Sequence, residues 1–291
     1  RKFIDRNRVN RIIVLSDGLA NVGPSGANEL GELGKQLGKE RIAVSTLGLG
    51  EGYNEDLLSQ LAMKSDGNHA FVRDPGELAK IFNYEFGDVL SVAAQEINVK
   101  IRCNEGIRPV RLLGRQGEID GQSAHIYLNQ LYSEQEKYVL LEVEVPSSDL
   151  LMVRPVADVA VKYANMETQT TDELTSKVSV RFTAFEQEVT RNINNPVMVQ
   201  CVSQIANLNT KLACTLIDHG KYEEANEVLV GNGTFLRDNN MFLKSQQLND
   251  MCLQNDFNTT KMKKGITAVE WNAVRKQIVD EAFAIENQRN F

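Results

Sequence analysis

The pattern of apolar and polar residues along the chain changes twice, and the first stretch, residues 1–86, alternates between strand and helix patterns. Its short β-branched runs are typical of strands that are buried on both faces, and its leucines recur at helical spacing. Strands are expected at 11–15, 42–47 and 69–72, and helices at 28–38, 57–62 and 76–82, with Asn28 as the first N-cap. Strands that alternate with helices predict an α/β layer on a parallel sheet with right-handed crossovers.

The second stretch, from about residue 96 to 185, has a period of two. Ile97, Val99, Ile101 and Cys103 alternate with polar residues, as strands with one buried face do. Further strands are expected at 110–113, 124–128, 138–145, 156–163 and 177–182, separated by turns at 104–106, 120–121 and 146–149. Several short strands with intervening turns predict an antiparallel β-sandwich.

The third stretch, from about residue 196, has a period of 3.6 and predicts a helical module. One apolar stripe runs through α-helical positions 201, 205, 208, 212 and 216 and ends at Gly220. Further helices are expected from Tyr222, near 241–253, and after Thr267, where Thr267 and Glu270 form a capping box. The predicted division is an α/β part at 1–86, a sandwich at 87–190 and a helical part at 191–291, without flexible linkers.

Charge and hydropathy narrow the classes of partner. The chain has 291 residues and a net charge of −7, and none of the three parts is basic. This composition argues against nucleic acid and against an anionic membrane surface as the main partner. No apolar run reaches 18 residues, so no transmembrane segment is expected. The chain opens at Arg1 without a methionine, which indicates a piece of a longer protein.

Cysteine and histidine spacing does not favour a metal centre or a catalytic site. The four cysteines form no CxxC pair and the three histidines are scattered, so we expect the cysteines to be small buried apolar residues. The chain also lacks the GxSxG pattern of a hydrolase nucleophile. We therefore predict a protein that is not an enzyme.

The strongest local candidate is Asp17, in the sequence Ser16-Asp17-Gly18 that follows the first predicted strand. Open α/β sheets place their ligands at the carboxyl ends of their strands. A carboxylate at that position suits a hard divalent cation, Mg²⁺ or Ca²⁺. The alternative is that Asp17 and Gly18 are turn residues that end the strand.

A second candidate is the run Gly48-Leu49-Gly50-Glu51-Gly52 after the second strand. It has GxGxG and not the GxGxxG of dinucleotide-binding loops, and Glu51 would repel a pyrophosphate. A tight strand-to-helix turn is the simpler interpretation. The rival function is a nucleotide-binding or hydrolytic enzyme that uses a pocket formed by Asp17 and Gly48–Gly52.

These residues together resemble part of a von Willebrand factor type A domain, of the bacterial subtype labelled calcium-activated-chloride-channel-like. The resemblance rests on Phe3, residues 9–18, Asn21-Val22-Gly23, the strand and turn at 42–52, and residues 54–58, 61–62 and 67–71, in this order. In that subtype a β-rich segment follows the domain, as residues 89–145 do here. The resemblance covers residues 1 to about 145, and the helical tail only loosely.

The resemblance implies a metal-ion-dependent adhesion site, in which a divalent cation bridges the domain to an acidic group of a protein partner. Such a site takes a DxSxS sequence, a threonine and an aspartate from three loops, and Asp17 matches the aspartate. The other two segments would precede Arg1. Because one carboxylate cannot hold Mg²⁺ in its octahedral geometry, we expect this chain alone to bind divalent cations weakly or not at all.

The resulting prediction is a protein-interaction module: the C-terminal half of a von Willebrand A-type layer, a β-sandwich and a helical domain. The half-sheet is expected to leave an exposed edge through which the chain could self-associate. Besides the enzyme named above, a structural assembly subunit that binds through its helical tail remains an alternative.

Overall fold

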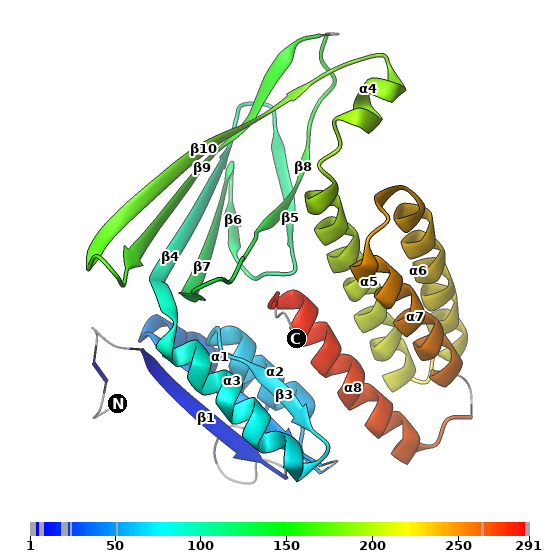
Figure 1. Ribbon diagram of the computed structural model, residues 1–291. Helices are drawn as coiled ribbons and strands as arrows, with labels where there is room; N and C mark the ends of the chain where they lie inside the picture. The colour runs from blue at the N-terminus through cyan, green and yellow to red at the C-terminus, as the bar shows by residue number, and fades with distance from the viewer. Residues whose placement is uncertain are drawn as a thin grey trace. The chain divides into compact units, whose positions relative to one another are not determined.

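The structure is a computed structural model that describes residues 4–5, 9–18, 23, 25–50, 52–149, 151–262 and 265–288. The chain forms two compact units, Arg1–Val189 and Thr190–Phe291 (Figure 1). The first unit contains an α/β layer followed by antiparallel sheets, and the second is helical. The three-part division expected from the sequence stays a prediction.

The α/β layer is built on three parallel strands in the order β1-β2-β3. Its elements are β1 (Asn10–Ser16), α1 (Ala27–Lys39), β2 (Ile42–Leu49), α2 (Glu55–Lys64), β3 (His69–Val72), a 3₁₀ turn (Pro75–Glu77) and α3 (Leu78–Leu90). The expected alternation of strand and helix is therefore present. Among the described strands, β1 has a neighbour on one side only.

Helices cover both faces of the central strand β2, whose side chains point alternately to either face. On one face the Thr46 hydroxyl donates to the Leu58 carbonyl of α2 at 3.0 Å. On the other face Leu47 packs with Ala70 and with Leu78, Ile81 and Phe82 of α3. This two-sided cover explains why the β2 sequence is almost continuously apolar.

The N-terminus of α1 differs from the expectation. Asn28 was expected to cap the helix, but the N-cap is Gly26, and Asn28 lies inside the first turn. The carboxylate of Glu29 accepts hydrogen bonds from the backbone N–H groups of Ser25 and Gly26, at 3.0 and 3.1 Å. A glutamate at this position can satisfy free N–H groups at the helix start, so the asparagine is not needed there.

The second half of the first unit contains two antiparallel sheets. Their strands are β4 (Val92–Cys103), β5 (Arg108–Leu113), β6 (Glu118–Asp120), β7 (Ser123–Tyr132), β8 (Leu140–Glu144), β9 (Val153–Asn165) and β10 (Thr170–Arg181). One sheet has the order β10-β9-β4-β7-β6 and the other is the pair β5-β8. The last expected strand, 177–182, is thus the end of a longer one that begins at Thr170.

The sheets enclose a core whose residues follow the predicted alternation. Ile97 and Val99 of β4 pack with Ala124, Ile126 and Leu128 of β7. Leu112 of β5 and Leu141 of β8 contact the same cluster from the smaller sheet. Because the two-stranded sheet is smaller than the five-stranded sheet, part of the five-stranded sheet is left uncovered.

The helical unit contains α5 (Asn195–Asp218), α6 (Tyr222–Leu243), α7 (Gln246–Lys261) and α8 (Ala268–Glu286), while α4 (Glu186–Arg191) spans the division between the units. The capping box of Thr267 and Glu270 is confirmed. None of the helices in the described part of the chain combines the length and the apolar character that a bilayer crossing requires.

The third helix expected near 241–253 is present as α7, but it begins only at Gln246, because a break lies inside the expected range. Lys244 adopts a left-handed conformation, with φ 50°, and ends α6. The Ser245 hydroxyl then accepts a hydrogen bond from the N–H of Leu248 at 3.4 Å and caps α7. The apolar periodicity continues across this break, so periodicity alone could not locate it.

The cysteines are free, in agreement with the absence of paired spacing. Cys103, Cys214 and Cys252 are buried and Cys201 is half-buried. The expectation of small buried apolar residues therefore holds for three of the four. Burial raises the pKa of the Cys103, Cys201 and Cys252 thiols, which keeps them protonated at neutral pH.

Candidate functional site

Asp17 lies directly after β1, at the carboxyl edge of the parallel sheet, and its side chain is exposed. The turn that presents it is short: the Ser16 hydroxyl donates to the Gly18 carbonyl at 3.2 Å. Leu19–Val22, Pro24 and Glu51, which belong to the sequence candidates, lie outside the described residues. The position of Asp17 is the ligand-binding edge of open α/β folds.

The loop between β2 and α2 approaches the Asp17 turn closely. A Cβ atom on Gly52 would lie 2.7 Å from the Asp17 carbonyl oxygen, so only a glycine lets the two loops meet without displacement. The rival function expected from the sequence joins Asp17 and the glycine run in one pocket, and Gly52 does lie next to the Asp17 turn. They form one surface at the ends of two neighbouring strands.

The first glycine of that run has a packing role. The Tyr53 ring lies over Gly48, where a Cβ atom would come within 2.1 Å of the ring. Tyr53 is buried and its ring also lies near those of His69 and Phe71, with centroids 6.1 and 6.0 Å apart. Gly50 has φ +65°, which also favours glycine. Close packing and turn geometry thus account for the glycines without a phosphate ligand.

Asp17 is the candidate metal ligand of this surface. Among the described residues no group of three or more His, Cys, Asp or Glu side chains is close enough to hold a metal ion. Asp17 could supply one oxygen ligand to a divalent cation, with the rest from other groups or water.

A buried charge network, which was not expected from the sequence, joins the first strand of the same sheet to α3. Arg11 of β1 and Glu85 of α3 form an ion pair at 2.7 Å, with side chains 4% and 0% exposed. Glu85 also accepts from the Asn68 amide at 2.7 Å and from the Ser45 hydroxyl. Arg11 donates in addition to the Tyr132 hydroxyl of β7, so this network joins the α/β layer to the sandwich.

A second buried carboxylate, Asp66, reaches from the α2–β3 turn to the sandwich. Its Oδ2 accepts from the backbone N–H groups of Asn129 and Gln130 at 2.7 and 3.3 Å. Its Oδ1 lies 3.5 Å from Arg115 and 3.8 Å from Lys137. Burial alone would raise the pKa of Asp66, but these two cations and two N–H groups together lower it. Asp66 thus stays ionised, and its contacts connect the α/β layer to the sandwich.

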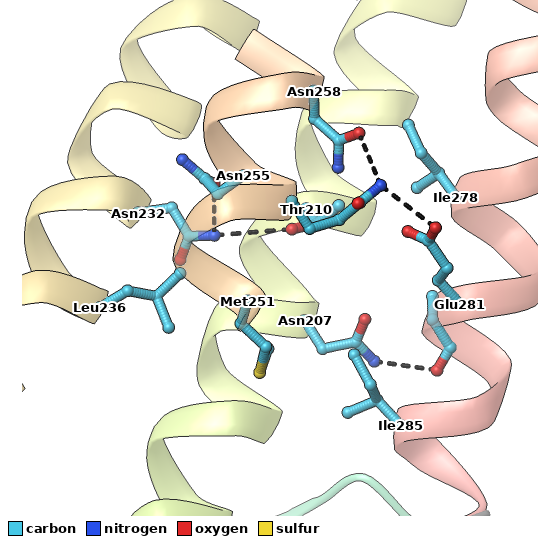
Figure 2. Close-up of a pocket in the computed structure, with 12 residues that line it drawn as sticks. Asn207, Thr210, Asn232, Leu236, Met251, Asn255, Asn258, Ile278, Glu281 and Ile285 are labelled. Atoms are coloured by element: carbon cyan, nitrogen blue, oxygen red, sulfur yellow. Dashed lines mark hydrogen bonds between the residues drawn. The ribbon is translucent and has the colours of Figure 1, made fainter. Parts of the chain in front are cut away.

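The helical unit contains a cavity of about 40 Å³ that is lined by both polar and apolar residues of its four long helices. Figure 2 shows amide side chains pointing into it from α5, α6 and α7 and a carboxylate, Glu281, from α8. Asn232 donates to Asn255 at 3.0 Å, and Gln254 donates to Glu281 at 3.1 Å. The volume suits about two or three water molecules, so it is too small for a cofactor.

Burial raises the pKa of Glu281, although the Gln277 and Gln254 amides oppose the rise by donating to its carboxylate. In the sequence, the cavity is visible only as asparagines at helical positions that otherwise carry apolar residues. That pattern alone does not indicate a chemical activity. We regard the cavity as part of the structural core of the helical unit.

Comparison with known sequences gives distant relatives. No family model matches the chain. YfbK of Escherichia coli is 28% identical over 97 residues, which are 33% of this chain and 17% of that protein. The protein sll0103 of Synechocystis is 22% identical over 147 residues, or 47% of this chain and 34% of that protein. The match thus spans a minor part of both relatives.

Comparison with solved structures shows the fold. A von Willebrand factor type A protein from Catenulispora acidiphila superimposes with a TM-score of 0.64 at 13% identity, over 90% of this chain and 60% of that chain. The ArnB paralog VWA2 from Sulfolobus acidocaldarius gives 0.53 at 19% identity, over 94% and 63%. The human COPII-coat protein Sec24c gives 0.57 at 12% identity, over 92% and 40%. The chain therefore has a von Willebrand A-type fold, as its sequence indicated.

Proposed function

We propose that this chain is a protein-interaction module of the von Willebrand A type, which captures its partner at the Asp17 edge of the α/β layer. The similarity of the fold to von Willebrand A structures supports such a role. The observation that carries it is the exposed carboxylate of Asp17, presented at the carboxyl end of β1 beside Gly52. In this proposal no reaction is catalysed.

The proposal includes a divalent cation between Asp17 and the partner. A Mg²⁺ or Ca²⁺ ion takes one oxygen from Asp17, further oxygens from neighbouring loops of the whole protein, and one from an acidic side chain of the partner. The bacterial channel-like subtype, and the supply of the missing loops by sequence that precedes this chain, belong to the same proposal. Such a contact is lost when the cation is removed.

The experiment compares capture of native partners by the wild-type protein and by Asp17→Asn, with and without EDTA. Crosslinking followed by mass spectrometry identifies proteins whose capture needs both Asp17 and a divalent cation. The matched control is Asp149→Asn, which removes an equally exposed carboxylate from a loop of the sandwich. Capture that survives EDTA and Asp17→Asn would show that the interaction uses another surface.

One observation favours the alternative in which the helical unit binds the partner. Met241 and Phe242 near the end of α6, and Leu253 on α7, are 65%, 74% and 64% exposed. Apolar side chains that exposed often belong to contact surfaces. If Met241→Lys with Leu253→Lys abolished capture while Asp17→Asn left it intact, this alternative would replace the first.

A further inference from the structure

The strand β10 is the outermost strand of the five-stranded sheet, and its outer edge is free in the described structure (Figure 1). It is long, with 12 residues from Thr170 to Arg181, and contains no proline. Its pairing with β9 shifts once, but the extra residue, Val156, belongs to β9. The outer edge is therefore a continuous row of N–H and C=O groups, which natural proteins seldom leave uncovered.

An apolar strip runs along this edge. Leu174 pairs with Val161 of β9, and Val178 pairs with Ala157. Val161 packs in the sandwich core, so Leu174 lies on the core face of the sheet, beyond the small sheet β5-β8. Leu174 and Val178 are nevertheless 59% and 46% exposed. The core face of the sheet thus continues onto a strand that nothing in the described structure covers.

We propose that β10 pairs antiparallel with β10 of a second copy of this chain, across a twofold axis at Ser176. Residues directly opposite each other in such a pair lie on the same face. In this register Leu174 lies opposite Val178 of the second copy, and Val178 opposite Leu174. The two apolar strips become one, and the two five-stranded sheets become a continuous sheet of ten strands.

Charge favours the same register. Glu173 lies opposite Ser179 of the second copy and diagonal to its Lys177 and Arg181, within reach of both cations. Lys177 lies opposite an uncharged residue, Thr175. No like charges lie opposite each other anywhere along the paired strands.

The neighbouring registers are worse. A shift of two residues in one direction places Lys177 opposite Lys177 of the second copy. A shift of two in the other direction places Leu174 opposite Ser176 and Val178 opposite Asp172. A shift of one residue would turn the apolar strip of the second copy to the other face. Of these registers, only the one about Ser176 places Leu174 opposite Val178 and keeps like charges from lying opposite each other.

This contact differs from the self-association expected at the open edge of the α/β sheet, because β1 and β3 form the edges of that sheet and β10 lies in the sandwich. It also uses none of the residues around Asp17. If this dimer did not form, the interaction site proposed at Asp17 would be unaffected.

The first test is sedimentation velocity of the chain over a range of concentrations up to about 0.2 mM. We expect a monomer–dimer equilibrium whose dissociation constant rises about tenfold in Leu174→Lys, because the lysine meets an apolar side chain twice across the axis. Leu174→Lys with Val178→Glu should restore the dimer, since the new charges then lie opposite each other. The control is Val269→Lys, at an exposed apolar residue of α8.

The second test is crosslinking by cysteine. Ser176→Cys should give a disulfide-linked dimer on mild oxidation, because residues that pair across the axis lie within disulfide distance. Thr175→Cys, whose opposite residue is Lys177, should not. A chain that stays monomeric, a dimer that Leu174→Lys does not weaken, or equal crosslinking at 175 and 176 would each overturn the proposal.

Discussion

The guanidinium of Arg11 and the carboxylate of Glu85 lie 2.7 Å apart, with 4% and 0% of their side chains exposed. The two residues are 74 positions apart in the sequence and join the first strand of the α/β layer to its last helix. Since Arg11 also contacts Tyr132 of β7, the same pair positions the sandwich relative to the strand that carries Asp17.

Replacing Glu85 by alanine should destabilise the first unit by about 3 kcal/mol or more, because it leaves a buried guanidinium without its counter-charge. Urea denaturation of the variant and the wild type measures the difference. Arg11→Met in the same chain should recover part of the loss, since it removes the unpaired charge.

The control for Glu85 is Glu142→Ala, which breaks the pair with Arg111 on the surface of the smaller sheet. That pair is 2.6 Å long but its side chains are 53% and 43% exposed. Exposed ion pairs contribute about 1 kcal/mol or less. Equal losses from Glu85→Ala and Glu142→Ala would contradict the structural role of the buried pair.

Asp66 makes stability depend on pH in the acid range. Its pKa is lowered in the folded state, so its contribution is present above the unfolded pKa, near 3.9, and is lost as pH falls through the folded pKa. Asp66→Asn should therefore be less stable than wild type at pH 7, and the difference should shrink below about pH 4. Thermal unfolding from pH 3 to 7 measures this.

Asparagine is the suitable replacement because Asp66 adopts a left-handed conformation, with φ 57°, that asparagine also tolerates. The matched control is Asp120→Asn, at an exposed carboxylate of β6. A difference between Asp66→Asn and wild type that stays constant with pH would argue against the ion pairs as the source.

Glu281 should act in the opposite direction. Burial raises its folded pKa, so the protein loses stability as pH rises from the unfolded pKa through the folded one. Glu281→Gln removes this ionisation and should raise the melting temperature of the helical unit at pH 7 to 8, with no gain near pH 4. Glu227→Gln, at an exposed position of α6, is the control.

Gly48 tests the close packing beside the Asp17 turn. Gly48→Ala should cost about 1–3 kcal/mol, because the added methyl group overlaps the Tyr53 ring. Gly231→Ala on α6 has open space around it and should be neutral or stabilising by up to about 1 kcal/mol. Denaturation midpoints of the two variants measure the contrast, and similar midpoints would contradict the packing role of Gly48.

Periodicity was sufficient for most of the elements. The apolar run at 42–47 is part of β2, a strand buried on both faces, and the alternation from Ile97 to Cys103 is part of β4, a strand buried on one face. Both kinds of burial produce a periodicity that can be read from the sequence. The position of Asp17 followed from the same reasoning, since it needed only the end of a strand.

Contacts between residues that are far apart in the sequence could not be predicted from periodicity. Glu85 resembles any charged residue of an amphipathic helix, and only the fold brings it to Arg11. Asn232 and Asn255 likewise sit on helix faces where apolar residues were expected. Asn232 donates to Asn255 across two helices, and Asn255 in turn donates to the Leu229 carbonyl. The break at Lys244 was missed because neither glycine nor proline marks it.

The central claim is that Asp17 is one ligand of a divalent cation, and the direct measurement is an NMR titration of the chain with Mn²⁺. At about millimolar Mn²⁺, the affinity expected of a single carboxylate with little support, paramagnetic broadening should concentrate on Ser16–Gly18, Gly50 and Gly52. Asp17→Asn should abolish this broadening, and Asp149→Asn should leave it unchanged. Broadening that persists in Asp17→Asn, or that spreads evenly over the exposed acidic residues, would contradict the claim.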